Sequence, residues 1–149
     1  MQLTRLVYAS NHGGIDIDTL REISEISTVN NSRDGITGFL VASEEDFMEF
    51  LEGSRTAIAQ SFIRIVQDDR HRHIRVLLAG PIKNRICANW TMHSVELAQI
   101  DADIMTRYWV NGSFSPDELS AEELENLCFE LCSTASDYPE ISPFTTPKS

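Results

Sequence analysis

The sequence predicts an α+β fold of the ferredoxin-like sandwich class, with a five-stranded mixed sheet, two helices on one face and a C-terminal helical cap. Three observations support this prediction. Five short segments have the apolar composition of strands, and two others carry apolar residues at helical spacing. These segments follow the order strand, helix, strand, strand, helix, strand, strand, which is typical of the class. A further helical pattern comes after the sheet.

The first strand and the first helix occupy the start of the chain. Residues 3–10 (LTRLVYAS) have the composition of a strand, and residues 16–28 form the first predicted helix. Asp16 or Asp18 can cap this helix, because a carboxylate there accepts hydrogen bonds from free backbone N–H groups. The apolar stripe of the helix consists of Ile17, Leu20, Ile23 and Ile26. We expect this stripe to cover the sheet.

Two strands and a second helix follow. Residues 35–43 and 47–52 are predicted strands joined by the acidic turn 44–46, which is the pattern of a hairpin with a solvent-exposed tip. Both faces of residues 36–41 are apolar, which predicts a central strand. Residues 55–68 form the second predicted helix. Its apolar face consists of Ile58, Phe62, Ile65 and Val66.

The last two predicted strands, over residues 74–78 and 90–97, complete the sheet. After residue 100 the composition changes. Ser115-Pro116, and Ser120 followed by Glu123, are helix-start signals. The helical segment that follows has an apolar stripe made of Leu124, Leu127 and Leu131.

These segments divide the chain into three expected parts. With 149 residues the chain is long enough to bury a single core. We expect the sheet domain to cover residues 1–97 and a C-terminal helical cap to cover residues 98–137. Residues 138–149 contain three prolines and few core residues, so a flexible tail is expected there.

The composition excludes several classes of partner. The net charge of -11, from 23 acidic and 12 basic residues, opposes contact with a phosphate backbone, so no nucleic acid is expected. No apolar run approaches the ~20 residues that span a bilayer, and the N-terminus lacks a signal-peptide pattern, so no membrane is expected. A cytoplasmic protein is the resulting expectation.

The three cysteines, Cys87, Cys128 and Cys132, predict neither a disulfide framework nor a metal site. Their number is odd and no CxxC motif is present. Cys128 and Cys132 lie in a helical pattern and are expected to pack as small apolar side chains. No four-ligand spacing connects them to His71 and His73, so no metal is expected. The sequence fixes no cation beside Cys87, so cysteine chemistry is not expected there.

An acidic side chain, Glu49, lies among apolar residues on a predicted strand. Because successive side chains of a strand alternate between faces, Glu49 shares a face with Phe47, where a bare charge costs free energy. Tyr8, Trp90 and Met92 are predicted on the same helix-facing side of the sheet. Each of these three can be ordinary core, but together with Glu49 they could surround a planar heteroaromatic ligand between the two helices.

Six spaced elements occur in order within the first 97 residues: LVYAS, Asn30-Asn31, GITGFL, FMEFLEG, RIVQDDRH and WTM. This combination closely resembles the BLUF domains, a family of blue-light sensors that use flavin. Any one fragment is a weak signal, whereas six in the right order form a highly specific one. The resemblance implies that residues 1–97 hold flavin beneath the two helices.

The resemblance also implies a role for each matching residue. Tyr8 falls at the position of the tyrosine that reduces the photoexcited flavin in a proton-coupled step. Asn31 matches the asparagine whose amide pairs with the flavin C4 carbonyl and N3 edge, and Asn30 is its more variable neighbour. Ile23 and Ile65 match apolar residues that sandwich the ring, although ordinary helix-face core would show the same residues.

Two further groups follow from the resemblance. One group lies where the family lines the pyrimidine edge and the exit toward the ribityl phosphate, and it could equally be solvent-exposed surface: Arg64, Asp68, Arg70 and His71. The other is the pair Trp90 and Met92 on the last strand. In the family, exchange of this pair in and out of the pocket is the proposed relay to the output surface.

Glu49 is the main departure, because the family has glutamine at this position. That amide both donates and accepts hydrogen bonds, whereas a carboxylate only accepts. Burial can raise a carboxyl pKa by ~3 to 5 units, so a protonated Glu49 could imitate the amide at pH 7. Two hypotheses stay open. Either a protonated Glu49 keeps the bridge to Tyr8 and supports a spectral change, or the chain binds flavin without forming a lasting signalling state.

The resemblance therefore implies a blue-light photoreceptor and not an enzyme. It would bind FAD, or else FMN or riboflavin, non-covalently and signal through hydrogen-bond rearrangement and electron transfer from Tyr8. We expect its output to pass through the cap to a homo-oligomer interface or a separate protein effector. The alternative is a ferredoxin-like flavin- or small-molecule-binding adaptor without productive photochemistry. In that alternative Glu49 pairs with a buried arginine.

Overall fold

A computed structural model describes residues 2–88, 92–110 and 112–135. The sheet domain contains β1 (Leu3–Asn11), α1 (Ile17–Asp34), β2 (Thr37–Ala42), β3 (Asp46–Ser54), α2 (Arg55–Gln67), β4 (Arg72–Ile82) and β5 (His93–Glu96). The C-terminal part contains the 3-10 turn η1 (Leu97–Gln99), α3 (Ala102–Thr106), β6 (Trp109–Val110), β7 (Ser113–Phe114), the 3-10 turn η2 (Pro116–Glu118) and α4 (Ala121–Ser133).

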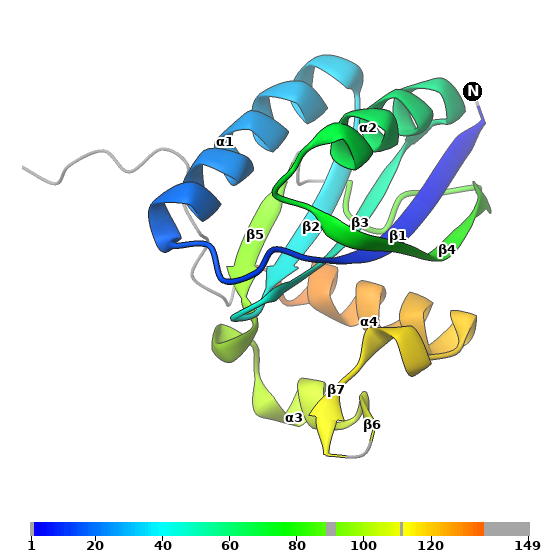
Figure 1. The fold of residues 1–149 in the computed structure, drawn as a ribbon. Helices are drawn as coiled ribbons and strands as arrows, with labels where there is room; N and C mark the ends of the chain where they lie inside the picture. The colour runs from blue at the N-terminus through cyan, green and yellow to red at the C-terminus, as the bar shows by residue number, and fades with distance from the viewer. Residues whose placement is uncertain (1, 89–91, 111, 136–149) are drawn as a thin grey trace, which may run out of the picture.

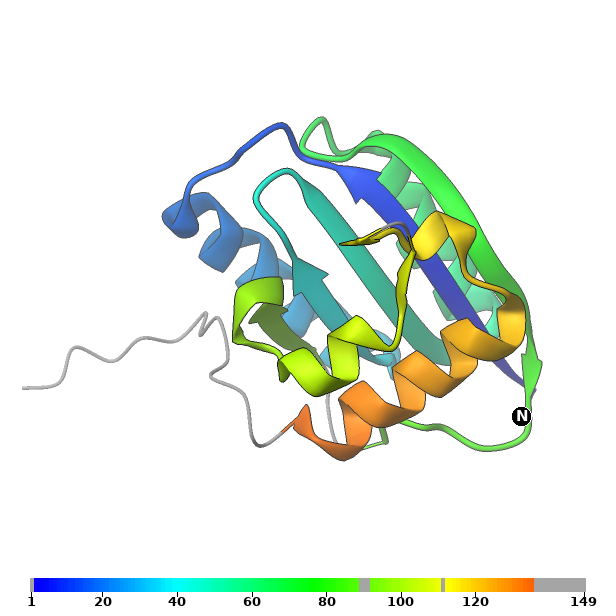
Figure 2. The ribbon, with the colours of Figure 1, turned by 90° about the horizontal axis from the view of Figure 1, so that it is seen from below.

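The main sheet has the strand order β4-β1-β3-β2-β5. Strands β2 and β5 are parallel, and the other neighbouring pairs are antiparallel. Helices α1 and α2 lie on one face of the sheet, and α4 lies across the opposite face (Figures 1 and 2). This arrangement confirms the predicted ferredoxin-like class, with its five-stranded mixed sheet, paired helices and C-terminal helix.

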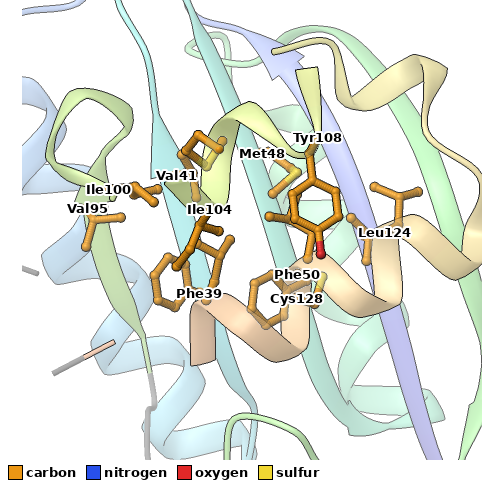
Figure 3. Close-up of a cluster of buried hydrophobic side chains, with 14 of the residues drawn as sticks. Phe39, Val41, Met48, Phe50, Val95, Ile100, Ile104, Tyr108, Leu124 and Cys128 are labelled. Carbon is orange, nitrogen blue, oxygen red and sulfur yellow. The ribbon is translucent and has the colours of Figure 1, made fainter. Parts of the chain in front are cut away.

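Side chains from the two faces of the sheet form two separate cores. The helix-facing core includes Leu6, Tyr8, Leu20, Ile23, Leu40, Phe47, Leu51, Ile58 and Met92. The cap-facing core includes Val7, Phe39, Phe50, Val95, Leu124, Leu127 and Leu131. Figure 3 shows part of the cap-facing core, in which Phe50 from the sheet lies beside Cys128 of α4, with Phe39 and Leu124 on either side of them. The predicted stripe of α4 therefore covers the face of the sheet that α1 and α2 leave open.

Helix α1 starts as predicted but ends later. The Asp16 carboxylate caps it by accepting a hydrogen bond from the backbone N–H of Thr19 at 2.8 Å. The helix continues to Asp34 instead of ending at residue 28. It ends there because Gly35 adopts a φ of 69°, a conformation that glycine takes without steric cost. Asn30 and Asn31 consequently lie on the last turns of α1.

Parts of two predicted apolar stripes are exposed. Ile17 and Ile26 of α1 are 41% and 44% exposed, and Val66 of α2 is 54% exposed. Adjacent helical residues point about 100° apart, so Val66 cannot share the inward direction of Ile65. Among the described residues, no helix is both long enough and apolar enough to cross a membrane.

The later elements also differ from the prediction in their bounds. Strand β4 extends to Ile82, well beyond the predicted 74–78, whereas the described part of the last strand is only His93–Glu96. Trp90 lies outside the described residues. The Ser120 and Glu123 capping box starts α4 as predicted, but Ser115-Pro116 starts the separate turn η2.

The cysteine prediction was wrong in one respect. Cys87 and Cys132 form a disulfide, with their Cα atoms 5.4 Å apart. The fold places the β4–β5 connection against the last turn of α4, and a sequence separation of 45 residues gave no sign of it. Cys128 is a buried free thiol in the core, as expected.

Candidate functional site

A cleft opens between α1, α2 and the sheet beneath them. It contains about 500 Å³ of space, its open mouth included. Its lining includes nine of the residues that the sequence predicted for a ligand site: Ile23, Asn30, Asn31, Glu49, Arg64, Ile65, Asp68, Arg70 and His71. Residues far apart in the sequence thus meet in one cleft.

A buried phenol–acid pair lies at the floor of the cleft, and of its two members Glu49 lines the cleft whereas Tyr8 does not. Tyr8 on β1 lies directly opposite Glu49 on β3, because these antiparallel strands pair in that register. The Tyr8 hydroxyl donates a hydrogen bond to Oε1 of Glu49. Tyr8 is 1% exposed and Glu49 is 4% exposed, so both groups are shielded from water.

Burial controls the ionisation of this pair. It raises the pKa of Glu49 from 4.5 to about 7, although the hydrogen bond from Tyr8 acts in the opposite direction. Burial and the nearby Glu49 charge raise the pKa of Tyr8 well above its ordinary value. At neutral pH Tyr8 is therefore a phenol that donates its proton in a hydrogen bond, while Glu49 populates both protonation states.

A neutral histidine lies beside the pair. Nδ1 of His71 is 2.8 Å from the hydroxyl oxygen of Ser10, and the ring centroids of His71 and Tyr8 are 6.0 Å apart. Burial lowers the pKa of His71 to about 4, so its imidazole is uncharged at neutral pH. His71 can therefore exchange a hydrogen bond with Ser10 without adding charge beside Glu49.

Charged side chains gather at the mouth. Arg64 bonds to Asp34, and Arg70 bonds to Asp68, each at 2.8 Å. Arg33 and Arg64 hold the pKa of Asp34 at about 2, and Arg70 lowers the pKa of Asp68. The side chains of Arg64 and Arg70 are 40% and 30% exposed, and both residues line the cleft.

The walls supply apolar surface and amides. Ile23 comes from α1 and Ile65 from α2, on the two sides of the cleft. Asn31, on the last turns of α1, is 3% exposed. Met92 is 4% exposed and belongs to the same helix-facing core as Tyr8 and Ile23.

If the chain were an adaptor without photochemistry, Glu49 was expected to pair with a buried arginine. The structure has a buried arginine, but its partner is a different glutamate. The buried arginine is Arg5, and it bonds to Glu52 at 2.8 Å. Glu52 is on the opposite face of β3 from Glu49, since their positions differ by an odd number. Within the described residues, Glu49 has Tyr8 and not an arginine as its partner.

Sequence reasoning missed several polar side chains of the site. Ser10 bonds to His71, and Ser27 and Ser61 line the cleft. Ser10 could have been predicted, because alternate side chains of a strand point to the same face and Ser10 is two positions after Tyr8. Nothing local distinguishes Ser27 or Ser61, because helical serines are common on solvent-exposed faces.

The apolar walls, the amides of α1 and the acid–phenol floor fit a planar heteroaromatic ring with polar edges. They define a small-molecule-binding α+β domain with its site between paired helices. Residues 3–93 match the BLUF family, described as sensors of blue-light using FAD. The chain belongs to the BLUF family.

Some of the similar proteins are enzyme subunits that are much longer than this chain. Subunit beta of the photoactivated adenylate cyclase of Euglena gracilis is 31% identical over 101 residues, which are 66% of this chain and 12% of the cyclase. The chain thus corresponds to a small part of that enzyme.

Solved structures that match over most of the chain include those of BlsA and BlrB. BlsA in its ground state is 25% identical with a TM-score of 0.82, covering 97% of this chain and 95% of BlsA. The BLUF protein BlrB in its dark state is 28% identical with a TM-score of 0.70, covering 89% and 97% of the two chains.

Proposed function

We propose that this chain is a blue-light photoreceptor that binds flavin non-covalently in the cleft between α1 and α2. The observation that carries the proposal is the buried Tyr8–Glu49 pair on the floor of that cleft, in a chain of the BLUF family. When bound, flavin supplies the absorption of blue light and a ring that accepts an electron. FAD is the expected form, with FMN or riboflavin as the alternatives.

The residues of the cleft each have a proposed task. Ile23 and Ile65 hold the ring from its two sides and exclude water. The amide of Asn31, with Asn30 beside it, pairs with the polar edge of the ring, since an amide both donates and accepts. Arg64 and Arg70 would hold a phosphate group of the cofactor by their charge, and Asp68 and His71 complete the lining.

Tyr8 and Glu49 carry the proposed response to light. Tyr8 gives up an electron, and its phenolic proton lies on the hydrogen bond to Oε1 of Glu49, which can receive it when ionised. When Glu49 is protonated, its proton is placed on Oε2, the oxygen that does not accept from Tyr8. That O–H can donate a hydrogen bond to a group in the cleft, as the amide of a glutamine would.

The pKa of Glu49 therefore decides which of two outcomes is expected at a given pH: a lasting spectral change when Glu49 is protonated, or no lasting signalling state when it is ionised. With a pKa of about 7, the protonated acid predominates below neutral pH and the carboxylate above it. We expect a lasting spectral shift after illumination at pH 6 and a smaller one at pH 8. Met92, which directly precedes β5 and belongs to the same buried core as Tyr8, is the proposed relay, together with Trp90.

The test is the flavin absorption spectrum before and after blue illumination, at pH 6 and pH 8, for the chain and for Glu49→Gln. The Gln variant should shift reversibly and equally at both pH values, because its amide does not titrate in this range. A chain that shows no shift at either pH beside a responsive Gln variant would rule out the protonated-acid mechanism. A protein that stays colourless when offered FAD would contradict flavin binding itself.

The proposed output is a change at the C-terminal cap that reaches a second copy of the chain or a separate protein. The similarity to the cyclase covers 12% of that enzyme, so the proposal transfers none of its catalysis to this chain. Light-scattering mass and hydrogen exchange, recorded in darkness and under blue light, test this output. Identical values in both states would count against it.

A further inference from the structure

The disulfide fastens the far end of the cap. Helix α4 lies across the face of the sheet opposite α1 and α2 (Figure 2), and Cys132 is in its last turn. Cys87 is in the connection between β4 and β5. The bond thus joins two segments that are 45 residues apart in the sequence. A covalent bond at this point restricts how far the end of α4 can leave the sheet.

Hydrogen bonds hold the segment around Cys87 to the sheet independently of the disulfide. The backbone N–H groups of Ile86 and Cys87 each donate to Oε1 of Glu52 at 2.9 Å. Glu52 is fully buried and is held by Arg5. Arg85 adds a hydrogen bond to the carbonyl oxygen of Gly35 at 2.8 Å. These contacts fix the connection to the sheet whether or not the disulfide is present, so α4 is the part that reduction would free.

The two bonded cysteines differ in exposure. Cys87 is 1% exposed, whereas Cys132 is partly exposed. Cys132 is therefore the side at which an external thiolate would attack, with Cys87 as the leaving group. The neighbouring Cys128 is fully buried, and burial raises the pKa of its thiol far above the ordinary range. It stays protonated and takes no part in the exchange.

We propose that Cys87 and Cys132 form a reversible redox site, at which a disulfide fastens α4 to the sheet and a dithiol reductant releases it. The thiolate of the reductant attacks Sγ of Cys132, and the Cys87 thiolate leaves and takes up a proton. The second thiol of the reductant then displaces Cys132. The protein gains two electrons and two protons, and the dithiol becomes a disulfide. This site goes beyond the proposed light response, because neither flavin nor light takes part.

The predicted consequence is a redox-dependent opening of α4. A disulfide of this kind typically suppresses opening on the order of 30- to 1,000-fold, so reduction should speed hydrogen exchange of the α4 amides by a factor in that range. Amides of β3 should stay protected in both states, because the anchor at Glu52 does not depend on the disulfide.

The test uses the full chain in darkness, equilibrated in mixtures of reduced and oxidised dithiothreitol. Mass spectrometry after unfolding and alkylation should find one free thiol, Cys128, under oxidising conditions and three under reducing conditions. Hydrogen exchange of α4 should follow the same transition. Finding three thiols under oxidising conditions, or equal hydrogen exchange of α4 in both states, would overturn the proposal. This test needs only the unsubstituted chain.

Variants supply the matched control. Cys132→Ser should show the fast α4 exchange of the reduced protein in every buffer, and Cys87→Ser should do the same. Cys128→Ala removes the third thiol, only four positions from Cys132, and should keep the full redox response. Loss of the response in a folded Cys128→Ala protein would show that the wrong pair had been assigned. None of these measurements uses flavin, so their failure is distinguishable from failure of the photoreceptor proposal.

Discussion

Glu49 and Glu52 lie three positions apart on one strand and have opposite surroundings. Glu49 faces apolar side chains and has the Tyr8 hydroxyl as its partner. Glu52 faces the cap, where Arg5 and the backbone N–H groups of Ile86 and Cys87 compensate its charge. The same side chain is thus a titrating group on one face of β3 and an ion-pair anchor on the other, because charge is stable in a protein only where partners replace water.

The raised pKa of Glu49 predicts a pH-dependent stability. Its folded-state pKa of about 7 exceeds the ordinary 4.5, so the folded protein binds this proton more tightly than the unfolded chain does. The stabilisation is complete below pH 4.5 and is lost as the pH rises through 7. At ~1.4 kcal/mol per unit it amounts to about 3 kcal/mol. Relative to Glu49→Gln, the free energy of unfolding of the chain should fall by about this amount from pH 4.5 to pH 8.

Comparison with the Gln variant at each pH is essential, because His71 titrates with the opposite sign. Its pKa falls from 6.5 to about 4 on folding, so its contribution is complete above pH 6.5 and is lost as the pH falls through 4. Urea denaturation of the flavin-free chain and of the variant gives the difference directly. A difference that does not change with pH would mean that Glu49 is not buried as described.

The buried ion pair predicts a large effect of a single substitution. Arg5→Met leaves the Glu52 carboxylate buried without its cation, which typically costs about 3–5 kcal/mol. The exposed pair of Arg21 and Asp18 offers a control, and Arg21→Met should change the free energy of unfolding by no more than about 0.5 kcal/mol. Urea denaturation of both variants measures the contrast. Similar effects of the two substitutions would contradict the role given to Arg5.

At the scale of elements, strands β2 and β3 approach closely at a glycine. A Cβ atom on Gly38 would lie 2.5 Å from the carbonyl oxygen of Phe50 and 2.9 Å from Cδ2 of Leu51. The contact with backbone cannot be relieved by a change of rotamer. Gly38 is therefore required by the spacing of the strands, and its place in the GITGFL segment has a steric reason.

This contact predicts a difference between two glycine substitutions. Gly38→Ala should destabilise the protein by about 1–3 kcal/mol, because overpacking moves strands that are already in contact. Gly80→Ala on β4 has no atom within 4 Å of the new Cβ, so the change there should stay within about 1 kcal/mol. Thermal or urea denaturation measures both. A larger loss at Gly80 than at Gly38 would refute the steric explanation.

Local signals predicted a helix or strand well where the sequence has a helix-capping residue or a periodic pattern of apolar residues. Asp16 and Ser120 marked two helix starts correctly, since capping depends only on neighbouring residues. The end of α1 was predicted too early, because its last turns carry polar residues and only Gly35 stops the helix. Strand β4 was predicted too short, because its length depends on pairing with β1 and not on its own composition.

At the scale of the whole molecule, helices cover both faces of the sheet (Figures 1 and 2), although the edge strand β4 has no buried residue. The cap-facing core depends on α4, whose Leu127 is fully buried, whereas Phe129 on the same helix is 60% exposed. The boundary of the predicted cap, at residues 98–137, and an oligomeric or effector-bound state stay predictions. The exposed Phe129 is on the outer surface of this cap.

Paired substitutions on α4 test whether the cap belongs to the cooperative fold. Leu127→Ala should cost about 2–5 kcal/mol, because it leaves a cavity between α4 and the sheet. Phe129→Ala should change the free energy of unfolding by no more than about 0.5 kcal/mol in the monomer. Urea denaturation followed by both fluorescence and circular dichroism measures these values. A cap that unfolds separately would appear as two transitions that do not coincide.

The sequence by itself determined the order of the main elements and the family, because periodicity, capping and short motifs are local properties of a chain. Through the family resemblance it also named nine of the residues that line the cleft. The family resemblance already implied that Glu49 meets Tyr8, and the structure has this contact. Only the tertiary structure gave Arg5 to Glu52 and joined Cys87 to Cys132. These pairings depend on strand register and on how α4 crosses the sheet. Both are set by the packing of residues far apart in the chain, and neither can be read from spacing along it.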